Sequence, residues 1–274
     1  MAADGSTPKT ADSKPAVSKR SRSRRPEAFE VTMWVTNLHD VEFGIYQHSR
    51  NQAKSRQFSK DMDIFAEIKV NGERAGLLSY RKDLWESERS MEKRLVIKLF
   101  SPTLNWRATL DLMNARSVQL THGARGLPVV AMSANLDDHD HMVHIERSAN
   151  KWTGLPENYS FFLFDEGQVR FYRLRKKWLS IGQDYVLYDW ANRKVGLLDG
   201  RVVNLGGKWK VRLDPEHATN KLVAVLQLFC GFLKFRSACM SHVAGLTAAL
   251  GNSKLSTKLE QTEADLYMNP RRVR

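Results

Sequence analysis

Cysteine is scarce in this sequence, with only Cys230 and Cys239 among 274 residues. If both lie on one helix, their spacing corresponds to about 13 Å along the axis, which is too long for a disulfide. A chain without disulfides is typical of a reducing compartment, so we expect a cytoplasmic protein. We assign the two thiols no chemistry, because cysteines on a buried helix usually serve as small apolar side chains.

An apolar segment is missing from the first thirty residues, and a secretory signal would need one. Ser, Thr, Pro and basic residues dominate there, so we predict a disordered basic tail over residues 1–27. This tail could be a nuclear address, an arm for nucleic acid, a tether to lipid headgroups, or simply a solvated segment. Its basic residues are Lys19, Arg20, Arg22, Arg24 and Arg25.

Motifs of the common catalytic classes are also missing. The sequence contains no Gly-x-Ser-x-Gly elbow, no His-Glu-x-x-His and no dinucleotide-binding fingerprint. Gly206-Gly207-Lys208 is not a phosphate-binding loop, because the first glycine of that motif would fall on Val202 and its Ser/Thr on Trp209. We therefore expect a non-enzymatic protein without a cofactor, although scattered side chains that meet in space are an alternative.

Potential metal ligands are dense in one segment only, Asp137–Glu146. His139 and His141 could project from the same side of an extended chain, but a zinc site needs about four converging ligands. No matched pair stands elsewhere at a diagnostic spacing. We predict a polar loop and no metal site, with His139 and His141 as weak candidates.

Positive charge is abundant: 43 Lys and Arg against 30 Asp and Glu give a net charge of +13. Such a surface favours a negative partner, which could be anionic lipid, nucleic acid or an acidic protein. Hydrophobic residues make up 42% of the chain, which is enough for a folded core.

Apolar and polar residues alternate with period two from Phe29 onward, as expected of strands with two unlike faces. The clearest runs are residues 31–36, 64–70, 95–99 and 104–112. Asn71-Gly72, Asp199-Gly200 and Gly206-Gly207 are pairs that favour tight hairpin turns. A repeat places residues 177–188 over 201–212 as two strand-turn-strand units. Many short strands at close spacing predict a barrel or a sandwich.

A long helix is predicted over residues 215–250, with Asp214 as N-cap and Pro215 at its first position. Residues 222–233 are apolar on every side except for Gln227, so protein or lipid must enclose them. About twelve residues span about 18 Å, short of the roughly 30 Å bilayer core. We therefore expect no transmembrane span, a helix enclosed by the sheet, and a polar tail over residues 251–274.

Three motifs and the helix after them resemble a known superfamily. The motifs are Lys-Lys-Trp-Leu-Ser-Ile-Gly-x-x-Tyr-x-Leu-Tyr-Asp from Lys176, Val-Gly-Leu-Leu-Asp-Gly from Val195, and Leu-Gly-Gly-Lys-Trp-Lys-Val from Leu205. Their order resembles the LURP-one-related and phospholipid-scramblase families of the tubby-like superfamily. The match covers about residues 170–240, and residues 29–157 match only loosely, which leaves open whether the first half belongs to the same domain.

The resemblance implies a mainly β fold, an antiparallel barrel of about twelve strands around the C-terminal helix, within a single domain at 28–250. It also implies a module that binds anionic, phosphoinositide-like phospholipid at a membrane surface. The lipid-binding basic residues of tubby have no matching motif here. The Cys-rich segment of scramblases is missing as well, which puts bilayer flipping in doubt.

Two basic triplets are the candidate anionic-ligand site. They are Arg173, Arg175 and Lys177 on one strand and Lys208, Lys210 and Arg212 on another. Period two places both triplets outside, with Trp178, Trp209 and most other aromatic residues inside. If the two strands are near neighbours, the six cations form one patch; otherwise they are solvated strand faces that aid solubility.

The leading functional hypothesis is thus a non-enzymatic module for anionic phospholipid, located in the cytoplasm or peripherally at a membrane. The first alternative is a nucleic-acid-binding or nuclear protein that uses the Arg-rich tail. The second is a protein-interaction scaffold. Sequence alone does not indicate the oligomeric state.

Overall fold

The computed structural model describes residues 27–33, 58–59, 61–125, 127–138, 141–148, 156–165, 167–178, 184–201 and 207–252. Apart from Glu27, Gly251 and Asn252, the two tails predicted from the sequence lie outside these residues.

The described chain contains twelve strands, two long helices and two short helical turns. The strands are β1 (Glu27–Met33), β2 (Met62–Val70), β3 (Glu73–Arg81), β4 (Val96–Phe100), β5 (Trp106–Leu112), β6 (Ala131–Leu136), β7 (Val143–Arg147), β8 (Asn158–Asp165), β9 (Gln168–Lys176), β10 (Tyr185–Asp189), β11 (Lys194–Arg201) and β12 (Lys208–Leu213). The helical elements are η1 (Asp83–Ser87), η2 (Ser90–Glu92), α3 (Asn114–Gly123) and α4 (Asn220–Gly251).

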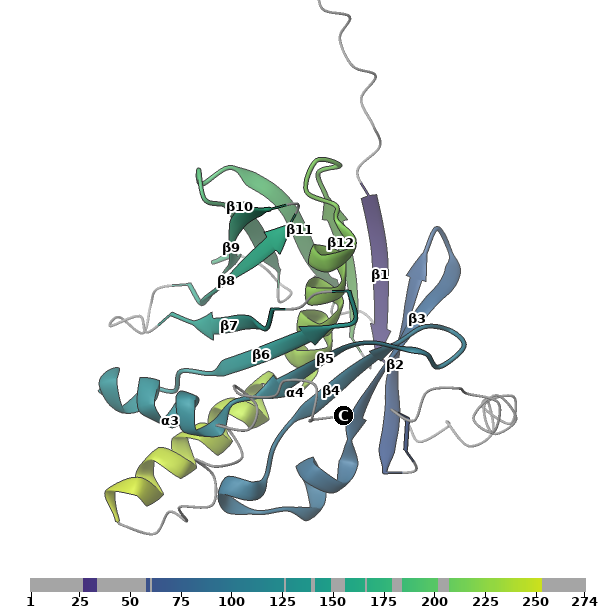
Figure 1. The fold of residues 1–274 in the computed structure, drawn as a ribbon. Helices are drawn as coiled ribbons and strands as arrows, with labels where there is room; N and C mark the ends of the chain where they lie inside the picture. The colour runs from purple at the N-terminus through teal and green to yellow at the C-terminus, as the bar shows by residue number, and fades with distance from the viewer. Residues whose placement is uncertain are drawn as a thin grey trace, which may run out of the picture.

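All twelve strands form one closed antiparallel barrel, in which each strand pairs with its sequence neighbours (Figure 1). β1 closes the barrel because it lies between β12 and β2, with Phe29 opposite Val211 on one side and Val70 on the other. The predicted fold class is therefore confirmed. Strands from both halves of the chain share this one sheet, which answers the question that the sequence left open.

Alternation along the strands separates an inner from an outer face. In β12, for example, Trp209, Val211 and Leu213 are buried, and Arg212 between them is exposed. The repeat seen in the sequence corresponds to the β9–β10 and β11–β12 connections, whose middle residues lie outside the described part of the chain. The repeated strands thus turn the same face toward the core.

Two of the three predicted turns can be compared with the structure. Asn71 and Gly72 have φ of 52° and 88° between β2 and β3, which confirms a tight hairpin with two positive φ angles. Asp199-Gly200 was wrongly predicted as a turn, since both residues lie within β11 opposite Lys210 and Trp209. Gly207 has a φ of 84°, and Gly206 is not among the described residues.

The C-terminal helix α4 begins later than the sequence predicted. Thr219 is its N-cap and accepts a hydrogen bond from the backbone N–H of Leu222. The predicted cap, Asp214, is wrong by five residues, because its N–H still donates to the carbonyl of Val195 as an extension of the β11–β12 pairing. Residues after Asp214 form a turn before the helix starts.

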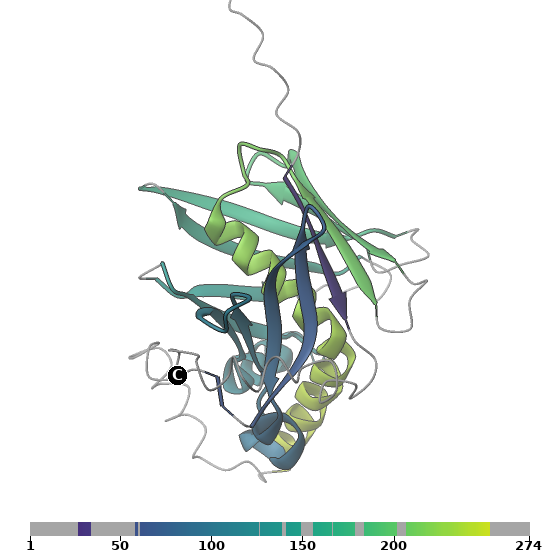
Figure 2. The same ribbon diagram turned by 90° about the vertical axis from the view of Figure 1, so that its right-hand side faces the viewer.

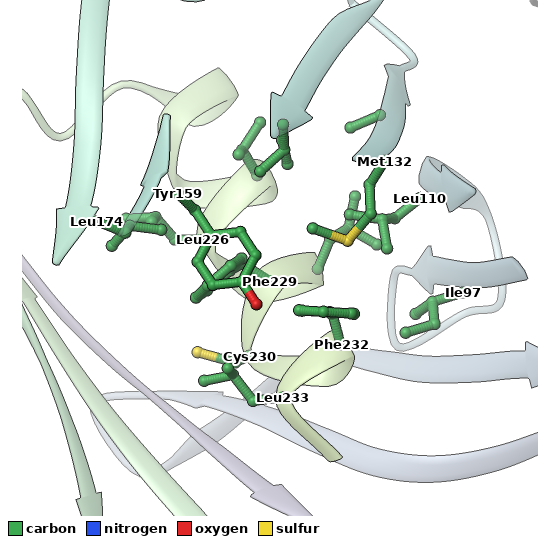
Figure 3. Close-up of a cluster of buried hydrophobic side chains, with 14 of the residues drawn as sticks. Ile97, Leu110, Met132, Tyr159, Leu174, Leu226, Phe229, Cys230, Phe232 and Leu233 are labelled. Atoms are coloured by element: carbon green, nitrogen blue, oxygen red, sulfur yellow. The ribbon is translucent and has the colours of Figure 1, made fainter. Parts of the chain in front are cut away.

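The apolar part of α4 runs through the barrel and is buried there (Figure 2). Phe229, Phe232 and Leu233 pack among strand residues such as Tyr159 and Leu110 (Figure 3). By length and composition alone this helix could cross a membrane, yet 67% of its most apolar window is buried inside the protein. The enclosure expected from the sequence is therefore present. Both cysteines on α4 are free and buried.

Candidate functional site

The predicted basic residues lie on two strands that are not neighbours. Arg173 and Arg175 belong to β9 and Lys208, Lys210 and Arg212 to β12, with Lys177 just beyond the end of β9. Strands β10 and β11 stand between them. Three strand spacings amount to about 14 Å, so the condition for one six-residue cluster is not met.

Three of the six predicted cations are held by acidic residues. Glu30 of β1 lies opposite Lys210 in the sheet. It forms ion pairs with Lys208 at 2.7 Å and with Lys210 at 3.6 Å. The hydrogen bond from Lys208 helps to hold the pKa of Glu30 below its ordinary value. Lys177 pairs with Asp184 at 3.4 Å. These three lysines fit the alternative reading of a charge-balanced, solvated strand face.

The three arginines have no acidic partner among the described residues. Arg175 and Arg212 are exposed and stand at the two ends of one cross-strand row, with Val186 of β10 and Leu197 of β11 between them. Arg173 donates a hydrogen bond to the side-chain oxygen of Asn192 and lies over the Tyr188 ring.

Lys194 of β11 joins the three arginines. It is exposed, pairs with Tyr188 in the sheet and likewise has no ion pair within the described chain. We call Arg173, Arg175, Lys194 and Arg212 the cationic face. Sequence reasoning missed Lys194 because it follows a turn and belongs to no alternating basic run.

Exposed aromatic residues were not expected, yet several lie beside the cationic face. On the outside of β8 and β9, Phe162 is opposite Phe171, and Phe164 is opposite Val169. The rings of Phe162 and Phe171 are 5.0 Å apart. Trp190 follows Asp189, the β10 residue that pairs with Tyr172 of β9. We call Phe162, Phe164, Val169, Phe171 and Trp190 the aromatic patch.

The inward placement predicted for the aromatic residues is thus wrong for this group. Phe162 is 55% exposed, Phe164 45% and Trp190 76%. Trp178, two residues beyond the end of β9, is also exposed. Trp209 is buried, as predicted.

The polar loop predicted over Asp137–Glu146 is only partly confirmed: the described residues Asp137, Asp138, His141 and Met142 lie between β6 and β7, whereas residues 143–146 belong to β7. His141 stacks near Phe164 with ring centroids 5.0 Å apart, and His139 is not among the described residues. Within the described chain, no group of three His, Cys, Asp or Glu side chains could hold a metal ion.

A buried carboxylate ties α4 to the barrel wall. Glu157 accepts hydrogen bonds from Arg147 at 2.9 Å, Arg236 at 2.7 Å, Tyr159 at 2.7 Å and Tyr185 at 3.1 Å. Burial opposes ionisation, but the hydrogen bond from Tyr159 and the charges of both arginines outweigh it and hold the pKa of Glu157 below its ordinary value. Because these donors satisfy the carboxylate and exclude solvent, we assign the group to stability.

Lys98 on β4 is a second buried charge that the alternation did not predict. It lies on the outer side of the sheet, between Ile97 and Leu99, which face the main core, and yet it is 1% exposed. Burial lowers its pKa to about 8, and the charge of Arg81 adds to this effect. A lysine so enclosed is not available to a ligand at the surface.

Comparison of the chain with protein-family models, with curated proteins and with solved structures finds no match in any of the three. The resemblance to the tubby-like superfamily therefore stays a prediction.

Proposed function

We propose that this chain is a non-catalytic module that binds anionic phospholipid at a membrane surface. The observation that carries the proposal is the cationic face, whose four side chains have no acidic partner within the described chain. A cation near an anionic membrane contributes about 1 kcal/mol. The twelve-strand barrel and the net charge of +13 support the proposal, and so does the tubby-like resemblance.

The spacing on this face favours a surface rather than a pocket for one headgroup. Arg175 and Arg212 are separated by three strand spacings, about 14 Å, and apolar Val186 and Leu197 lie between them. Two cations so far apart would contact neighbouring lipids and not a single phosphate. The cytoplasmic leaflet is the anionic one, so the proposal places the protein at that face of the membrane.

The test is co-sedimentation with vesicles of phosphatidylcholine alone or mixed with phosphatidylserine or a phosphoinositide. We expect the double variant Arg175→Glu/Arg212→Glu to lose at least about 30-fold in affinity for anionic vesicles, because two cations account for about 2 kcal/mol before repulsion is added. The control is Arg89→Glu/Arg125→Glu, which changes the net charge equally at exposed loop residues. Equal losses in both variants would contradict a specific face.

The Arg-rich tail provides the second arm of this test. A chain that begins at residue 27 should still bind anionic vesicles if the barrel itself binds the lipid. If binding requires residues 1–26, follows total charge and disappears with added salt, the nucleic-acid or scaffold hypothesis becomes the better one.

A further inference from the structure

The aromatic patch is an exposed apolar surface on the outside of the barrel, and His141 from the segment before β7 lies 5.0 Å from one of its rings, that of Phe164. Its residues form two cross-strand pairs on the outside of β8 and β9, and Trp190 extends it to the turn after β10. Three of its rings are about half exposed or more. Single exposed apolar residues are common on proteins, but a contiguous group on one face marks an interaction surface.

Charge around the patch indicates the chemistry of its partner. Asp165, at the end of β8, is buried and pairs with Lys221 at 3.8 Å. Asp189, before Trp190, is buried and pairs with Arg193 at 2.8 Å. Among the described residues, these two acidic groups beside the patch are therefore already paired with cations.

The cationic face adjoins the patch directly. Arg173 follows Phe171 by two residues on the same side of β9 and lies opposite Ser160 of β8. Apolar rings next to cations that have no acidic partner in the described chain match a membrane interface, where acyl chains lie beneath anionic headgroups. Trp also favours this boundary, because its ring combines apolar surface with one polar N–H.

We propose that the aromatic patch inserts into the headgroup–acyl boundary of an anionic membrane, with Phe162, Phe164 and Trp190 as anchors. This inference rests on the proposed function and adds the orientation of the bound protein. The outer face of β8, β9 and the turn after β10 points into the membrane, while the cationic face contacts headgroups. Apolar insertion and charge attraction together supply the two weak anchors that stable peripheral binding needs.

Trp190 reports insertion directly, because it is the most exposed residue of the patch. The full chain is mixed with phosphatidylcholine and phosphatidylserine vesicles that carry bromine on the acyl chains, and quenching of Trp fluorescence is measured. We expect quenching in the wild type, its loss in Trp190→Phe, and its retention in Trp178→Phe. Trp178 is a matched control, since it is 72% exposed but lies beyond Lys176, the end of β9, which is itself about 17 Å along the strand from Phe171.

A double variant measures the apolar contribution to affinity. Phe162→Ser/Phe164→Ser replaces two side chains that are about half exposed, so the fold should persist, and circular dichroism checks this. At high salt, where charge attraction is screened, we expect affinity for the same vesicles to fall about 10-fold to 30-fold. The salt dependence of binding should stay that of the wild type.

The outcomes separate this inference from the proposed function. If the wild type binds anionic vesicles but neither Trp190 quenching nor the double variant shows an effect, the inference is wrong and lipid binding stands. If sedimentation shows a dimer that Phe162→Ser/Phe164→Ser dissolves, the patch joins two copies and the inference is again overturned. If the wild type binds no vesicle, both proposals fail.

Discussion

Glu157, which is buried, links α4 to the barrel wall through hydrogen bonds. Its carboxylate accepts a hydrogen bond from Arg236 of the helix at 2.7 Å and one from Arg147 of β7 at 2.9 Å. Breaking a buried ion pair by removing one partner costs about 3–5 kcal/mol. We expect Glu157→Gln to lower the free energy of unfolding by this amount near neutral pH, measured by urea denaturation.

The same carboxylate predicts a pH dependence of stability. The pKa of Glu157 is lower in the folded protein than its ordinary value of 4.5, so folding favours the ionised form. The stability that the ionised carboxylate gives to the folded protein is complete above that value. It is lost as the pH falls through the lowered pKa of the folded state. The difference in stability between wild type and Glu157→Gln should therefore narrow below about pH 4.5, whereas a constant difference would contradict the assignment.

Single residues also show where sequence reasoning ends. Period two separates inner from outer positions, but it does not say whether an outer position is open to water. Lys98 and Phe162 both lie outside the barrel, and the first is buried whereas the second is exposed. What covers an outer face depends on elements packed against the sheet from elsewhere in the chain, and no local pattern records that.

The start of α4 provides a test at the level of elements. The hydroxyl of Thr219 accepts from the N–H of Leu222, and loss of such a cap costs about 1 kcal/mol. We expect Thr219→Ala to destabilise the protein by about this amount in urea denaturation. Asp214→Ala is the matched control and should cost less than half as much, because Asp214 precedes the helix; a larger loss there would restore the cap predicted from the sequence.

Elements were predicted well where periodicity is strong and poorly where two signals compete. The runs that overlap β1, β2, β4 and β5 are strands as expected, and residues 34–36 of the first run lie outside the described part of the chain. Asp199-Gly200 has turn chemistry, but its backbone pairs with β12, and this long-range pairing overrides the local preference. The cationic triplets alternate as predicted, yet their separation depends on strand order, which alternation does not contain.

At the scale of the whole molecule, the barrel and its helix should unfold together. α4 contacts β1, β4 and β5 from the first half of the chain and β8 from the second, and its side chains belong to the same core cluster as those strands. We expect far-UV circular dichroism, which reports the helix, and fluorescence of buried Trp85 and Trp209 to give one coincident transition in urea. Two separated midpoints would show that the halves fold independently.

Closure by β1 has a consequence for how the chain is made. This strand is the first of the barrel to leave the ribosome, and one of its two partners, β12, is the last. The helix that fills the interior follows later still. Phe29 and Val31 are buried in the folded protein. They can therefore become buried only after nearly the whole domain has been synthesised. Pairing between strands so distant in the sequence makes folding slow and leaves the nascent chain with exposed strand edges. We therefore expect chaperones to bind the nascent chain before the folded protein reaches a membrane.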